Sequence, residues 1–91
     1  MTFRQELGNS IRDKRLDAKM TQSQLAQRIG KSNHCVSLYE TGRRMPTVET
    51  MAIMSHVLDA SLDDMVPHVT YDIKVDEDQT TIFDVIGEED D

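Results

Sequence analysis

Hydrophobic side chains recur at spacings of three and four residues from Phe3 to Val66, and short polar breaks divide this stretch into five segments. Such spacing collects the apolar residues on one face of an α-helix. The expected helices span about residues 3–18, 22–29, 33–40 and 46–58, with a last short turn at 61–64. Because a chain of 91 residues forms a core only when nearly every helix contributes a face, we predict a compact all-α bundle.

Capping residues support the boundaries of the second and third helices. Thr21 precedes the second helix and Gln24 follows three residues later, which is the pattern of a capping box. Gly30 can adopt the left-handed backbone that ends a helix, and Ser32 can then cap the third helix. Gly42 marks the end of that third helix. The chain is therefore expected to turn sharply between two short helices.

The same periodicity identifies the side chains that should face the core. On the first helix the inward stripe steps by four residues through Phe3, Leu7, Ile11 and Arg15. On the third helix Val36 and Tyr39 are large apolar residues three positions apart, so they should point inward. On the fourth helix the expected inward residues are Val48, Met51, Ala52 and either Met54 or Ser55.

After Pro67 the pattern changes from helical spacing to alternation. Apolar residues occupy every second position from Val69 to Val75, and alternation returns from Thr81 to Ile86 after a polar break. Alternation of this kind indicates strands. We therefore predict a β-hairpin over residues 67–87, which serves either as a dimerisation element or as a docking surface for a protein partner. The acidic end, residues 88–91, is predicted to be disordered.

The net charge of −7 at first argues against a nucleic-acid partner, because phosphate binding usually needs a basic surface. The distribution of charge changes this picture. Residues 1–66 carry nine Lys or Arg and eight Asp or Glu, which gives +1, whereas residues 67–91 carry one Lys and nine Asp or Glu, which gives −8. The acidity therefore belongs to the C-terminal segment, and the helical part is free to present a basic face.

Several classes of function find no support in the residues. The single cysteine, Cys35, cannot form an internal disulfide, and neither a leader nor a membrane-length apolar run is evident, so we expect a cytoplasmic protein. His34 adjoins Cys35, but His56 and His68 are remote in sequence, so we expect no metal site. We also expect no enzyme and no cofactor, because no glycine-rich phosphate loop or nucleophile–base spacing is present.

Residues 21–42 are predicted to form two short capped helices joined by a tight turn, which is a helix-turn-helix arrangement. The second helix of such a motif enters the major groove of DNA, and its N-terminal side chains meet base edges. Because Val36 and Tyr39 should face inward, the outward side chains of this helix become the candidate base contacts. They are Asn33, His34, Ser37 and Leu38.

A second set of polar residues surrounds that helix and is suited to the DNA backbone. Gln22 begins the helix that crosses the backbone, where a side-chain amide and free backbone N–H groups can bond a phosphate. Cationic side chains flank the reading helix and would neutralise phosphates, adding affinity that falls as salt rises. The candidate phosphate contacts are Gln22, Lys31, Ser32, Arg43 and Arg44.

These motifs resemble the Xre/Cro-type helix-turn-helix family, which includes phage repressors. The resemblance rests on Met20-Thr21-Gln22, Leu25-Ala26, Gly30, Ser32, Glu40-x-Gly42 and Pro46. It extends from about Leu7 to Leu62-Asp63-Asp64-Met65, which resembles the fifth helix of the family. About two thirds of the chain is covered, and the C-terminal segment lies outside it.

The resemblance implies further properties. Arg15 and Glu40 stand where the family has an ion pair between its first helix and its reading helix, and we expect this structural pair to fix the angle between them. A dimer on a roughly palindromic operator is implied, with half-sites about 34 Å apart. The chain departs from the commonest family pattern at Leu38, where polar residues are frequent, and at Tyr39, where aliphatic residues are frequent.

The sequence thus predicts a five-helix, repressor-like DNA-binding domain at residues 1–66, followed by the hairpin segment and the acidic tail. The expected function is a dimeric, sequence-specific transcriptional regulator, a repressor by its family, whose partner is double-stranded DNA. Two alternatives stay open. One is an antitoxin that binds its operator with the helices and a toxin with residues 67–91. The other is an adaptor that binds protein alone.

Overall fold

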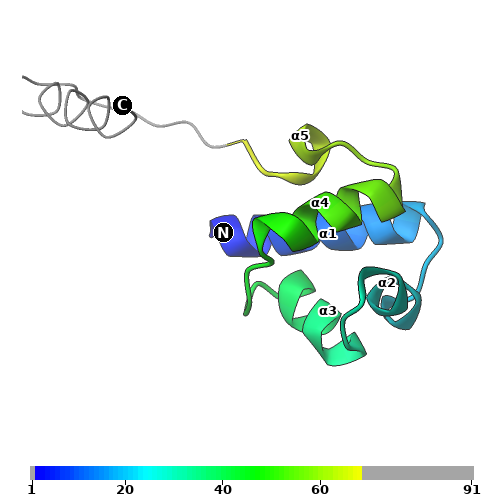
Figure 1. Cartoon of the computed structure of the whole chain (residues 1–91). Coiled ribbons are helices and arrows are strands. Elements are labelled where there is room, and N and C mark those ends of the chain that lie inside the picture. The colour runs from blue at the N-terminus through cyan, green and yellow to red at the C-terminus, as the bar shows by residue number, and fades with distance from the viewer. Residues whose placement is uncertain (1, 69–91) are drawn as a thin grey trace, which may run out of the picture.

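Five helices make up the regular structure of the chain in the computed structural model, which describes residues 2–68 (Figure 1). Their bounds are α1 Phe3–Asp17, α2 Gln22–Ile29, α3 Asn33–Glu40, α4 Val48–Leu58 and α5 Leu62–Met65. The described residues contain no strand. The predicted all-α bundle of five helices is confirmed, and α2 and α3 have the predicted bounds.

Side-chain caps set where the helices begin. The Thr21 hydroxyl accepts a hydrogen bond from the backbone N–H of Gln24 at 3.1 Å, and the Gln24 side chain accepts one from the Thr21 N–H at 2.9 Å. The predicted capping box of α2 is therefore present, and Ser32 caps α3 as predicted. Gly30 ends α2 with φ of 72°, a left-handed conformation that favours glycine. These caps bring α2 and α3 into the predicted helix-turn-helix.

Replacing Thr21 by alanine should lower the free energy of unfolding by about 1 kcal/mol, because the first turn of α2 loses its side-chain acceptor. Serine at this position keeps the hydroxyl and should retain most of that stability. Urea unfolding of the three proteins measures the difference. Equal losses of unfolding free energy for alanine and serine would show that the hydroxyl at position 21 contributes nothing to stability.

The core lies between the helices and is aliphatic and methionine-rich. Its fully buried side chains, each less than 2% exposed, are Ile11, Leu25, Val36, Met54 and Met65. The inward assignments of Leu7, Ile11 and Arg15 on α1 are confirmed, as are those of Val36 and Tyr39 on α3.

Three residues that were predicted to face the core are exposed instead, so these predictions were wrong. Phe3 is 38% exposed and Val48 84% exposed, and Ala52 is also exposed. Phe3 belongs to the first turn of α1, at the margin of the bundle (Figure 1). On α4 the buried face consists instead of Thr50, Met51, Met54 and Leu58. Because α4 carries apolar residues on more than one side, periodicity alone could not select the face that packs.

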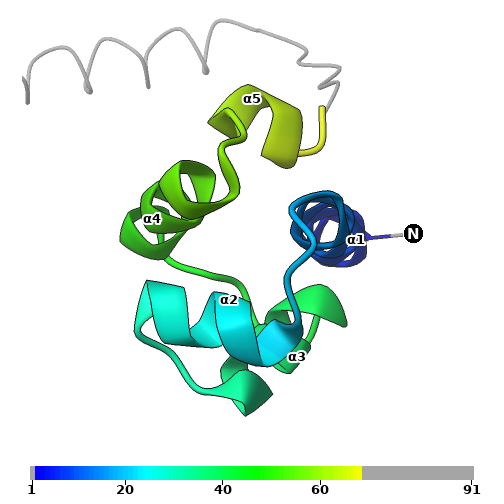
Figure 2. The ribbon, with the colours of Figure 1, turned by 90° about the vertical axis from the view of Figure 1, so that its right-hand side faces the viewer.

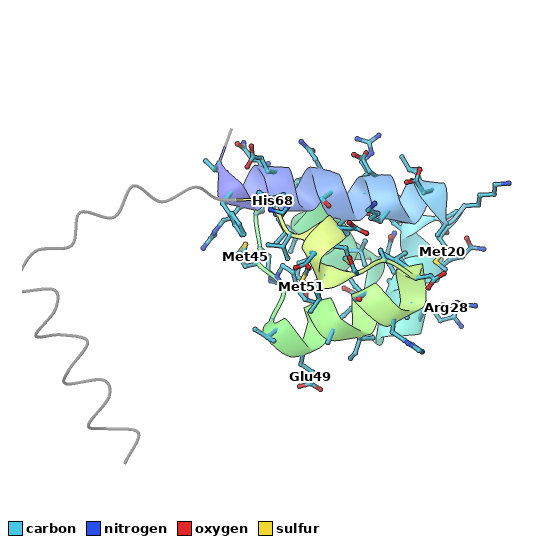
Figure 3. All side chains as sticks on the ribbon, turned by 90° about the horizontal axis from the view of Figure 1, so that it is seen from above. Met20, Arg28, Met45, Glu49, Met51 and His68 are labelled. Carbon is cyan, nitrogen blue, oxygen red and sulfur yellow. The ribbon has the colours of Figure 1, made fainter. Side chains whose placement is uncertain are left out.

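The helices are arranged so that α2 and α3 form one side of the domain. Figure 2 shows these two helices below, α4 and α1 on opposite flanks, and α5 on the far side from α3. Seen from above, α1 and α4 form opposite edges with α5 between them (Figure 3). The helix-turn-helix therefore has an open side, whereas α1, α4 and α5 support it from behind.

The hairpin predicted for residues 67–87 lies, from Val69 onward, outside the described residues, as does the predicted disordered end at 88–91. Both stay predictions, together with the division of the chain at residue 66. Within residues 2–68 no helix is long and apolar enough to cross a membrane.

Candidate nucleic-acid interface

The side of α3 that faces solvent is mostly polar. Asn33 and His34 are exposed, and Ser37 and Leu38 are half-buried beside them. The two apolar residues of the opposite face, Val36 at 0% and Tyr39 at 5% exposure, are buried. The structure therefore brings all four predicted base-contact residues onto α3 with at least part of each side chain accessible.

A side-chain cap begins α3, and buried side chains pack the helix against the core. The Ser32 hydroxyl accepts from the Cys35 N–H at 3.0 Å, and the Cys35 side chain is buried in the core. Burial raises the pKa of the Tyr39 hydroxyl, and the neighbouring Cys35 side chain raises it further. Both effects favour the neutral hydroxyl, which suits a residue that anchors α3 from inside the core.

A buried ion pair joins α1 to the end of α3. Arg15 Nε lies 2.6 Å from Glu40 Oε2, and Arg15 Nη2 donates to Glu40 Oε1 at 3.0 Å, which makes the pair bidentate. Arg15 Nη1 also donates to the Met20 carbonyl at 2.9 Å. The two side chains are 10% and 3% exposed. The pair implied by the family resemblance is present, and it fastens three segments of the chain at one point.

Gln22 belongs to the same network, which the sequence did not reveal. Its Nε2 atom donates a hydrogen bond to Glu40 Oε1 at 3.0 Å, and its side chain is half-buried. An amide nitrogen carries two hydrogens, so this bond leaves one for a phosphate oxygen. The network thus orients the Gln22 amide beside the end of α3, which a role as a phosphate contact requires.

Three cationic side chains predicted to contact phosphate are exposed around α3. Lys31 lies in the turn before α3, and Arg43 and Arg44 follow it in the loop toward α4. Arg44 Nη1 donates to the Cys35 sulfur at 3.8 Å, so this arginine is held against α3 itself. The fifth candidate, Ser32, is exposed; its hydroxyl accepts as the cap of α3, which leaves its O–H free to donate to a phosphate.

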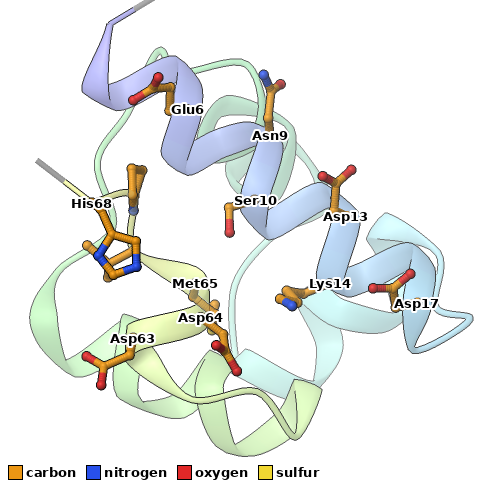
Figure 4. Close-up of a pocket in the computed structure, with 12 residues that line it drawn as sticks. Glu6, Asn9, Ser10, Asp13, Lys14, Asp17, Asp63, Asp64, Met65 and His68 are labelled. Atoms are coloured by element: carbon orange, nitrogen blue, oxygen red, sulfur yellow. The ribbon is translucent and has the colours of Figure 1, made fainter.

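The opposite side of the domain has the reverse charge. A groove of about 650 Å³ between α1 and α5 is lined by Lys14 and by five carboxylates, Glu6, Asp13, Asp17, Asp63 and Asp64 (Figure 4). Because α5 lies on the far side from α3, this acidic groove and the exposed cations lie on different sides of the domain. An approaching polyanion would be directed to the α3 side.

No group of three or more metal-ligating side chains that could hold an ion occurs within residues 2–68. His34 points to solvent, whereas Cys35 is buried, so the two adjacent residues face different surroundings.

The chain is similar to a known protein in sequence and to a solved protein in structure. Multiprotein-bridging factor 1a of Arabidopsis thaliana is 37% identical over 57 residues, which are 63% of this chain and 40% of that protein. This chain thus spans less than half the length of that relative. The clp gene regulator ClgR of Corynebacterium glutamicum has a crystal structure that matches with a TM-score of 0.69 and 32% identity, covering 71% of this chain and 69% of that chain.

An enzyme also contains this fold. Hydroxypropylphosphonic acid epoxidase from S. wedmorenis matches with a TM-score of 0.71 and 24% identity over 80% of this chain, but over only 39% of its own. That likeness shows the fold alone. A family model described as Helix-turn-helix matches residues 11–65, which is more than half of the chain and includes all of α2 to α5. The chain therefore belongs to the helix-turn-helix family of the Xre/Cro type that its sequence resembles.

Proposed function

We propose that this protein is a sequence-specific, DNA-binding transcriptional regulator that reads the major groove with α3. The observation that carries the proposal is the mostly polar, solvent-facing side of α3, which is joined to α1 by a buried ion pair and flanked by three exposed cations. Specific DNA binding needs two kinds of contact, base contacts for specificity and phosphate contacts for affinity, and this combination supplies residues for both. The helix-turn-helix family and the regulator ClgR support it.

Base recognition is assigned to the outward side chains of α3. Asn33 can donate to N7 and accept from N6 of an adenine, and Ser37 can bond either partner of a base pair. Leu38 offers an apolar contact to a thymine methyl, and it is half-buried beside Ser37. His34 is exposed next to Asn33 and completes the set. An operator half-site containing A·T pairs is expected.

Positioning on the backbone is assigned to Gln22, Lys31, Ser32, Arg43 and Arg44. The cations supply the part of the binding energy that depends on salt, whereas Gln22 and the turn before α3 fix the register. In this proposal two copies bind a roughly palindromic operator and repress by occupying a promoter. Family membership supports DNA binding, and the charge asymmetry of the domain supports an approach of DNA to the α3 side.

The proposal is tested by selecting bound duplexes from a random library and then measuring the affinity of the best duplex in a salt series. We expect a recurring A·T-containing motif and a steep loss of affinity as salt rises. The same series with a scrambled duplex is the control for non-specific binding. Absence of any enriched motif, with binding equally weak to all duplexes, would contradict the proposal.

Replacing Arg43 by alanine should weaken binding to every duplex about equally and make the salt dependence shallower by about one unit of log–log slope per protomer, because one phosphate contact is lost. Lysine keeps the charge and should restore most of the slope. The measurement is the slope of log affinity against log salt for the three proteins. An unchanged slope in the alanine variant would remove Arg43 from the interface.

The antitoxin and adaptor alternatives depend on a protein partner. The segment proposed to bind a toxin lies almost entirely outside the described residues, so no contact seen in the domain favours either alternative over DNA binding.

A further inference from the structure

The outer face of α4 exposes two large apolar side chains, Val48 and Ile53, beside the small Ala52. Its exposed residues are Val48, Glu49, Ala52, Ile53 and His56, and every other residue of the helix is buried or half-buried. Val48 is 84% exposed, the highest value among the large exposed hydrophobic residues, and Ile53 is 38% exposed. Apolar side chains gathered on one helix face are typical of a docking surface.

The two polar residues on this face are arranged for pairing with a copy of itself, because the Glu49 carboxylate can accept a hydrogen bond and the His56 imidazole can donate one. Glu49 lies in the first turn of α4 and His56 in its last turn, seven residues apart and on the same stripe. Two α4 helices packed antiparallel would place Glu49 of each copy beside His56 of the other, with Ala52 and Ile53 at the centre. The small Ala52 side chain allows the two backbones to approach closely. An interface of this kind is isologous, and each contact occurs twice.

The position of α4 fits such a pair on DNA. In Figure 2, α4 lies on the flank of the domain, and α2 and α3 lie below it. Glu49 projects outward from that flank in Figure 3. A two-fold axis beside α4 and directed toward the DNA would make the two α4 helices antiparallel. The same axis would leave both α3 helices facing the same side, as a palindromic operator requires.

We infer that the outer face of α4 is the contact surface of a symmetric homodimer, with Glu49 and His56 pairing across the two-fold axis. The inference rests on the proposed dimeric function and names its interface. An eleven-residue helix is about 16 Å long, so the area it buries is well below that of a standard stable interface. The dimer is therefore weak and concentration-dependent, and a palindromic operator stabilises it.

Sedimentation equilibrium of the full chain tests the inference through paired substitutions at residues 49 and 56. His56→Glu places carboxylates opposite each other twice and should raise the dimer dissociation constant by at least about tenfold. The double variant Glu49→Lys with His56→Glu places a lysine opposite each new carboxylate and should bring the constant back to within about threefold of wild type. Leu16→Glu adds the same side chain at an exposed site on α1 and should leave the constant unchanged.

Binding to a duplex that contains one half-site is measured in parallel and should be the same for wild type and His56→Glu. An unchanged dissociation constant in His56→Glu, or no restoration in the double variant, would overturn the inference. A protein that binds half-sites but stays monomeric even on a full palindrome would also overturn it, while leaving the proposed function in place. A dimer that responds to the paired substitutions but binds no duplex would support the interface and contradict the DNA-binding function.

Discussion

Replacement of Glu40 by alanine is expected to lower the free energy of unfolding by about 3–5 kcal/mol, because it leaves the Arg15 guanidinium buried and without its carboxylate. Both side chains are at most 10% exposed, and the carboxylate accepts from Arg15 twice and from Gln22 once. Thermal or urea unfolding of the folded domain gives the difference.

A double replacement distinguishes the cost of leaving one buried charge unpaired from the contribution of the ion pair to stability. Arg15→Met together with Glu40→Leu removes both charges and keeps apolar volume, so it should be less destabilising than Glu40→Ala alone. We expect this double variant to bind DNA less well than its stability suggests, because the network that positions Gln22 and the end of α3 is gone. A double variant as unstable as Glu40→Ala would show that packing, and not the unpaired charge, dominates the loss.

Replacement of Gly8 by alanine is expected to cost about 2–3 kcal/mol of stability, although alanine is the better helix former by about 1 kcal/mol. A Cβ at this position would lie 2.5 Å from the carbonyl oxygens of both Tyr39 and Glu40. Those atoms are backbone, so α1 must move away from the end of α3. The expected result is a lower urea midpoint with an unchanged slope.

Asp13→Ala is the matched control on the same helix, because Asp13 is exposed and its replacement adds no clash. It should change the free energy of unfolding by no more than about 0.5 kcal/mol. A Gly8→Ala protein as stable as this control would mean that α1 can shift away from the end of α3 without any loss of stability.

The helices of this domain could be predicted because their signals are local. Thr21 with Gln24, Gly30 and Ser32 each act within one turn of backbone, so the sequence specifies the bounds of α2 and α3 without knowledge of the rest of the chain. The burial of Val36 and Tyr39 follows from their spacing on a helix whose other side is polar. The outward residues of α3 follow in turn, which is why the candidate base contacts could be named.

What could not be predicted depends on contacts between helices. The spacing of Val48 and Ala52 is as regular as that of Met54 and Leu58, and only the positions of α2 and α5 decide which pair is buried. The hydrogen bond from Gln22 to Glu40 joins residues 18 positions apart and has no local signature. The close approach of Gly8 to the end of α3 is likewise a property of packing.

The central claim, that α3 reads bases, is tested most directly by the sequence preference of Asn33→Ala. The measurement is the affinity ratio between the selected operator and variants with single base-pair changes, for wild type and Asn33→Ala at one salt concentration. We predict that discrimination falls by about 1–3 kcal/mol at one base pair of each half-site and stays unchanged at the others. A ratio that is unchanged at every position, or that falls equally at all of them, would contradict the account.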